Sequence, residues 1–176
     1  MKKTIRLLGL SILFFSQMLF MLSCSFLKNE DEMIEEKVQN LISYLDNDDI
    51  EGIKSLFAEK QIENNNDFEL SLNELVEYYD GTSISKIQGS MGTDKDKNQN
   101  YQATWYNIPY KITTTAEEYR LAIYWCIEYS SNSKQLGIWS LYIIKEQDYP
   151  TPTYTYRGDG LWTPGINIGK VYDESE

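Results

Sequence analysis

Carboxylates and tyrosines are the side chains of this chain that could carry out acid–base chemistry. The sequence has 14 tyrosines and 27 aspartates and glutamates, but no histidine. Without an imidazole, the chain has no histidine-based triad or metal centre and lacks the commonest general base. A carboxylate base beside a tyrosine that donates to an oxyanion is a chemistry that stays open. Its candidates in the predicted strands are Tyr106, Tyr124, Glu128 and Tyr142.

Tryptophans supply a second kind of candidate, an aromatic binding surface. Trp105, Trp125 and Trp139 also fall within predicted strands, where aromatic residues are favoured for structural reasons alone. Most should belong to the core, and any surplus should line a pocket, a dimer face or a docking groove. The predicted pocket-lining set combines both kinds of residue: Trp105, Tyr106, Tyr124, Trp125, Glu128, Trp139 and Tyr142. No spacing among them matches an enzyme motif, so no catalytic residue is assigned.

Residues 47–58 nearly form a calcium-binding loop but lack one ligand. Oxygen donors stand at the first, third and fifth positions from Asn47, and Gly52 stands at the sixth. The twelfth position is Ala58, where such loops need a bidentate glutamate. We therefore predict no metal site and no other cofactor.

Residues 1–23 have the composition of an export signal. Lys2, Lys3 and Arg6 precede an apolar stretch from Leu7 to Leu22. That stretch is shorter than the ~20 residues that a membrane span needs. We expect a cleaved signal peptide, with an uncleaved membrane anchor as the alternative.

The segment MLSC, at residues 21–24, resembles the lipobox of bacterial lipoproteins, with Met21 where leucine is usual. The resemblance implies cleavage before Cys24, a diacylglycerol on its thiol, and attachment to the outer side of the cell membrane. Residues 24–31 would then be a short tether. A disulfide between Cys24 and Cys126 is the alternative, but Cys126 lies in a predicted buried strand.

The net charge limits the partners of the chain. The formal charge is −11, and removing the three basic residues of the signal leaves 13 basic against 27 acidic residues, a charge of −14. Such a chain is repelled by phosphate backbones and by anionic lipid surfaces. We expect no nucleic-acid binding, and we expect membrane attachment only through the lipid.

Helical periodicity dominates the first half of the mature chain. Apolar residues recur at helical spacing in residues 32–46, in residues 47–60 and in a third segment that ends before Gly81. Ser71 and Glu74 have the spacing of a capping box, which predicts that the third helix starts at Ser71.

Alternation typical of strands follows from Thr82 onward. Residues 83–90 predict a short, bulged strand, and residues 94–100 are polar and predict a loop. Long strands are expected in residues 101–115, 118–129 and 136–146, the second with Tyr119, Leu121, Ile123, Trp125, Ile127 and Tyr129 on one face. Helices followed by antiparallel hairpins predict an α+β fold. Residues 148–176 are rich in proline, glycine and tyrosine and form an extension, part of which should pack on the domain.

Four segments carry a family resemblance: the third helix ending in YYDG, the strand SISKI, and the strand pair YRLAIYWCIEY and LGIWSLYIIKE. In this order they resemble the NTF2-like (cystatin-like) α+β cone superfamily. The chain is similar, more narrowly, to the DUF5104 lipoproteins of low-GC Gram-positive bacteria. The resemblance covers residues 32–147. It implies three helices packed on a curved antiparallel sheet of about four strands.

Three functions are compatible with these features. The first is an exported, lipid-anchored, non-catalytic module that binds a small apolar ligand, a wall component or a protein. The second is an isomerase- or hydrolase-like enzyme with an Asp/Glu–Tyr pocket. The third is a protein that forms a homodimer, or binds a toxin or wall protein, through its sheet.

Overall fold

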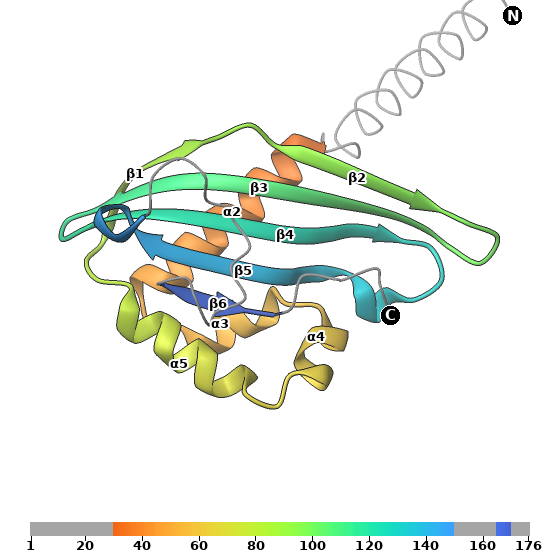
Figure 1. Ribbon diagram of the computed structural model, residues 1–176, viewed down its shortest axis with the longest axis horizontal. Helices are drawn as coiled ribbons and strands as arrows, with labels where there is room; N and C mark the ends of the chain where they lie inside the picture. Colours follow the sequence, from red (N-terminus) through yellow and green to blue (C-terminus); the bar gives the residue numbers. More distant parts are fainter. Residues whose placement is uncertain (1–29, 150–164, 170–176) are drawn as a thin grey trace, which may run out of the picture. The chain divides into compact units, whose positions relative to one another are not determined.

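The structure, a computed structural model, describes residues 30–149 and 165–169 (Figure 1). Cys24 and the segment that resembles a lipobox lie outside these residues. The chain has two units, Met1–Gln39 and Asn40–Glu176, and helix α2 (Glu30–Asp46) begins in the first and ends in the second. Within the described ranges, no helix has the length and hydropathy needed to cross a membrane.

Three short helices follow α2 in the second unit: α3 (Ile50–Ser55), α4 (Glu59–Asn64) and α5 (Phe68–Tyr78). The single helix predicted for residues 47–60 is therefore wrong. It is interrupted at Leu56–Ala58 because the backbone there bonds to a strand: Ile138 N donates to Leu56 O at 2.8 Å, and Ala58 N donates to Ile138 O at 3.0 Å. These bonds to the sheet replace those that would have continued the helix.

Helix α5 begins four residues earlier than the capping box predicted, since the N-cap is Asp67 and not Ser71. Ser71 N donates to Asp67 O inside the first turns. Leu70, which precedes the predicted start, is 59% exposed. The helix starts earlier because Phe68, which is 2% exposed, packs edge-on against Phe57 and so brings one more turn into the core.

The sheet is antiparallel, open, and has six strands among the described residues. They are β1 (Ser83–Gln88), β2 (Gly92–Lys97), β3 (Gln102–Thr114), β4 (Glu118–Tyr129), β5 (Gly137–Lys145) and β6 (Ile166–Ile168). The order is β1-β3-β4-β5-β6, and β2 pairs with the other end of β3 (Figure 1). Two 3-10 turns, η1 (Ser133–Gln135) and η2 (Glu146–Asp148), flank β5.

The α+β class and the order of helices before sheet are confirmed, but the expectation of about four strands is wrong. One added strand, β2, comes from the predicted polar loop at residues 94–100, and the other, β6, from the extension. Pairing with a neighbouring strand makes both of them strands, since β2 has no large apolar residue and β6 is only three residues long. The predicted packing of part of the extension is confirmed for Ile166–Ile168, which pair with β5.

The sheet has two faces that differ in what covers them. The face that we call the helix face contacts α5 and its C-cap: Tyr119 stacks on the C-cap residue Tyr79 at 4.9 Å, and Lys145 N donates to the Tyr78 hydroxyl at 3.0 Å. Its other side chains are almost wholly buried: Tyr106, Ile108, Tyr110, Ile112, Leu121, Ile123, Trp125, Ile138, Leu141 and Ile143. The hydrophobic core of this unit therefore lies on the helix face.

Candidate binding surface

The opposite face of the sheet, which we call the aromatic face, carries five rings in continuous contact. Trp105 lies at the centre, stacked on Tyr124 with ring centroids 5.3 Å apart and planes at 4°. Trp139 meets the Trp105 ring edge-on at 5.1 Å, and Tyr129 does so at 6.4 Å. Tyr129 in turn stacks on Tyr101 at 4.9 Å. We call these five residues the aromatic cluster.

Two β-bulges bring the cluster together. In β4, Cys126 pairs with Trp105 and Glu128 with Thr104, so Ile127 has no partner of its own. The bulge reverses the alternation beyond it. As a result, Tyr129 lies beside Trp105 on the aromatic face, and the prediction that it shares a face with Tyr119 is wrong.

The second bulge lies in β5, at Trp139, which has no cross-strand partner in β4. Ile138 pairs with Trp125 and Ser140 with Tyr124, so Trp139 is the inserted residue. Its side chain packs with Cys126 and Ala58 on the aromatic face, where it is 6% exposed. Its indole Nε1–H donates to Gln135 O at 2.7 Å, which satisfies the polar atom of a buried ring.

Cys126 lies beneath these rings as a free thiol that is 1% exposed. Burial raises its pKa to about 12, although its Sγ–H donates to the Glu128 carbonyl at 3.4 Å. A thiol with a raised pKa is a poor nucleophile. Cys126 is therefore an apolar part of the packing.

The predicted pocket-lining residues divide between the two faces of the sheet. Tyr106 and Trp125 are cross-strand partners in the core of the helix face, at 5% and 2% exposure. Trp105, Tyr124 and Trp139 belong to the aromatic cluster. No described cavity unites the whole set.

Tyr142 and Glu128 lie apart from the cluster. Tyr142 is buried with Ala122 and Ile144 further along the aromatic face. Glu128 is exposed, and its carboxylate accepts from the Thr104 hydroxyl at 2.9 Å and from Gln102 Nε2 at 3.3 Å.

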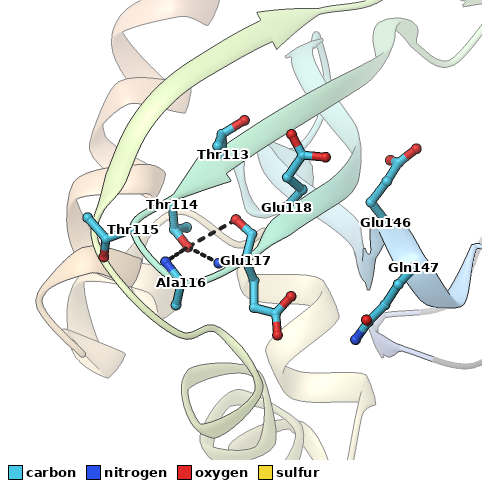
Figure 2. A pocket seen from close by; sticks show the side chains of 8 residues that line it. All are labelled: Thr113, Thr114, Thr115, Ala116, Glu117, Glu118, Glu146 and Gln147. Carbon is cyan, nitrogen blue, oxygen red and sulfur yellow. Dashed lines mark hydrogen bonds between the residues drawn. The ribbon is translucent and has the colours of Figure 1, made fainter.

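A depression of about 400 Å³ lies at the hairpin between β3 and β4 (Figure 2), and no residue of the aromatic cluster lines it. It is lined by Thr113, Thr114, Thr115, Ala116, Glu117, Glu118, Glu146 and Gln147. Each of its three carboxylates is paired with a cation: Glu117 with Lys145 at 3.3 Å, Glu118 with Lys111 at 3.1 Å, and Glu146 with Arg120 at 2.7 Å. The Arg120 guanidinium lowers the pKa of Glu146. All three carboxylates of the depression are therefore engaged in ion pairs.

Two tyrosines with raised pKa values meet where the end of α5 contacts β4: Tyr79, the C-cap of α5, and Tyr119 of β4. Burial raises the pKa of Tyr79 to about 12 and also raises that of Tyr119. The Tyr79 hydroxyl bonds to Ser83, which also donates to Asp46 Oδ1 at 2.8 Å. Tyr119 accepts from Asp80 N at 2.8 Å. These hydroxyls stay protonated and tie the helices to the sheet.

Within residues 30–149 and 165–169, no three acidic or cysteine side chains gather in a way that could hold a metal ion. In the near-calcium loop, Asp49 Oδ1 accepts from Gly52 N at 2.9 Å and so caps α3. Asp49 is therefore accounted for as the N-cap of α3, a position that favours aspartate without any metal ion.

The comparisons with known proteins give one family match. No curated protein matches the chain. The model of a family described as a domain of unknown function, DUF5104, matches residues 40–146, more than half of the chain. The match spans the helices from the end of α2 to α5 and the strands β1 to β5. The chain belongs to the DUF5104 family.

Proposed function

We propose that this protein is an exported, lipid-anchored, non-catalytic binding module with an NTF2-like cone fold, held on the extracytoplasmic face of the cell membrane. Its binding surface is the aromatic cluster. The diacylglycerol is on Cys24, and the domain that binds follows a short tether.

The observation that supports a binding role is the aromatic cluster itself. Its five rings come from three strands and the turn before β3, and they lie on the face opposite the core. Trp105 and Tyr124 are only partly buried, although large aromatic side chains are most favourably buried in a core. Partly buried, ordered rings are the usual anchors of interfaces, since little conformational entropy is lost when they bind.

An enzyme with an Asp/Glu–Tyr pocket has less support. That chemistry needs a carboxylate and a tyrosine together in a cavity that excludes water. The carboxylates of the depression at the β3–β4 hairpin are ion-paired, and the buried Tyr79 and Tyr119 have raised pKa values. Glu128, the carboxylate of the predicted set, is exposed.

The binding role is tested by native mass spectrometry of the full chain extracted from the membrane of the cells that produce it. We expect a bound mass on the wild-type protein that is lost in Trp105→Ala. The matched control is Ile84→Ala, since Ile84 is 66% exposed on β1 and lies outside the cluster; this variant should keep the bound mass. Equal retention by both variants, or a wild-type protein with no bound mass, would contradict the proposal.

The anchor is tested separately by the intact mass of the same protein. We expect a chain that begins at Cys24 and carries a diacylglycerol, and we expect Cys24→Ala to keep its first 23 residues. A wild-type mass that still includes Met1 would refute the lipid anchor and leave the binding surface untouched.

A further inference from the structure

Strand β2 is a charged edge of the sheet. Its sequence is GTDKDK and all six residues are exposed. Among the described residues it pairs only with β3, so the backbone groups of its outer side are not used by another described strand (Figure 1). An edge strand of this kind is a template for a further strand.

The register between β2 and β3 separates the charges of β2 by face. Asp94 is opposite Trp105 and Asp96 is opposite Ala103, so both carboxylates share the aromatic face. Lys95 and Lys97 are opposite Thr104 and Gln102 and therefore lie on the other face. The aromatic cluster is thus bordered by two carboxylates at its open edge.

Trp105 has Asp94 of β2 as its cross-strand neighbour on one side and the β4 strand, which carries Tyr124, on the other. Tyr124 stacks on the side toward β4, and β2 lies on the other side of β3. A cation over the indole on the β2 side would contact both the ring and the Asp94 carboxylate. Each of these contacts attracts a Lys or Arg side chain.

No described lysine or arginine forms an ion pair with Asp94 or Asp96. The Tyr101 hydroxyl, a neutral group, donates a hydrogen bond to Asp96. The cations of the aromatic face, Lys111 and Arg120, lie at its other end, where they are paired with Glu118 and Glu146. The β2 end of this face is therefore negative, in a chain whose net charge is already −11.

The charge pattern of β2 disfavours antiparallel pairing between two copies of this strand. In an antiparallel pair, directly opposite residues lie on the same face. Two copies of β2 joined edge to edge in this antiparallel way would never set aspartate opposite lysine; centred on Lys95, they would set Asp94 opposite Asp96 and Lys95 opposite Lys95. Like charges directly opposite destabilise a strand pair. The edge is instead complementary to a strand with basic residues at alternate positions.

We propose that an extended, basic segment of a partner protein adds to the outer edge of β2. Lysine or arginine at alternate positions of that segment contact Asp94, Asp96 and the indole of Trp105. The inference rests on the proposed binding function and names its partner class. An extended polypeptide fits better than a small cation, because the two carboxylates recur at the two-residue period of a strand on an open face.

The test measures binding of labelled ten-residue peptides to the full chain in detergent, by fluorescence anisotropy at low salt. The probe has five alternating Lys-Thr pairs. We expect it to bind, and we expect a Glu-Thr peptide of the same length not to bind. A peptide with the same composition but consecutive lysines, and a Lys-Thr peptide N-methylated at alternate residues, should each bind more weakly, because strand addition needs both the spacing and the backbone N–H groups.

Protein variants locate the site. Asp94→Asn combined with Asp96→Asn should weaken binding roughly fivefold or more, in keeping with the loss of two exposed ion pairs. Trp105→Phe should weaken it less, since a smaller ring keeps part of the cation–π attraction. The matched control, Glu74→Gln with Glu77→Gln, removes two exposed charges from α5 and should leave the affinity unchanged.

The proposal is overturned if the double aspartate variant binds as well as the wild type, or if the N-methylated and consecutive-lysine peptides bind as well as the probe. A dimer in sedimentation that the double aspartate variant alters would assign the edge to a second copy instead. A retained mass in the native spectrum without peptide binding would remove this inference and leave the proposed function standing.

Discussion

At the scale of single residues, burial raises the pKa of two weakly acidic groups, the thiol of Cys126 and the hydroxyl of Tyr79. Both are at most 5% exposed, and burial is the largest cause of the raised pKa of each. A buried group that stays neutral contributes to packing, but its ionised form would be costly in the same place. The folded state is therefore stable while both groups are neutral and loses stability when they must ionise.

We predict that the stability of the protein falls as the pH rises above about 9. The pKa of Cys126 is raised from 9.0 to about 12 and that of Tyr79 from 10.0 to about 12, so the unfolded chain loses these protons first. Since the unfolded state then binds fewer protons than the folded state, the free energy of unfolding decreases between pH 9 and 12. Urea unfolding at a series of pH values measures this slope.

Single variants separate the two contributions to that slope. In Cys126→Ala the decrease should begin near pH 10 instead of pH 9, and in Tyr79→Phe it should be shallower above pH 10. Slopes identical to that of the wild type in both variants would show that other groups cause the effect.

At the scale of elements, the segment Leu56–Ala58 joins the helices to the sheet. It bonds to both the N–H and the carbonyl of Ile138, and it lies so close to Gly137 that an added Cβ would be 2.5 Å from Ala58 N and 2.7 Å from the Phe57 carbonyl carbon. Gly137 also has φ +129°, which side chains rarely adopt. The contact between segment and strand therefore requires glycine at this position.

We predict that Gly137→Ala destabilises the protein by about 2–3 kcal/mol, because the new methyl group overlaps backbone atoms that cannot move aside. The control is Gly92→Ala in β2, where the nearest atom to the added Cβ is Asn107 Cβ at 3.7 Å. Its effect should stay within about 1 kcal/mol. The urea unfolding midpoints of the two variants measure this difference. Equal losses of stability in both would contradict the role given to the Leu56–Ala58 segment.

At the scale of the whole sheet, its last strand comes from outside the region that the family model matches. That region ends at residue 146, whereas β6 spans Ile166–Ile168 and pairs with Leu141–Ile143 of β5. Ile168 has no exposed surface, and β6 also contacts α5. The extension therefore contributes to the folded sheet of the second unit.

We predict that Ile168→Ala lowers the free energy of unfolding by about 2–4 kcal/mol, as expected for a fully buried branched side chain. Ile84→Ala, at a site that is 66% exposed, should change it by less than about 0.5 kcal/mol. Thermal or urea unfolding of the full chain gives both values. A small effect of Ile168→Ala would mean that β6 is not part of the cooperative unit.

The period of the apolar residues made much of the fold predictable. Alternation in residues 118–129 and helical spacing in residues 32–46 identify β4 and α2, since a buried face repeats at the period of its element. β2 could not be recognised in this way, because an exposed edge strand needs no apolar residue and its DKDK sequence is typical of a loop. β6 could not be predicted either, because a strand of three residues is too short to show a period.

The candidate surface was predictable as a set of residues but not as an arrangement. Trp105, Tyr124 and Trp139 were candidates from their types alone. Tyr129 and Trp139 reach Trp105 through the bulges at Ile127 and Trp139, and Asp94 borders it through the register of β2 with β3. A bulge shifts alternation by one residue, and nothing in the local sequence of β4 marks where that shift occurs.

The sequence by itself determined the α+β class, the acidic charge and the segment that resembles a lipobox, because composition and period act locally along the chain. Only the tertiary structure decided which aromatic residues lie away from the core and which carboxylates border them. These facts depend on strand register, and register is set by hydrogen bonds and packing between segments far apart in the chain.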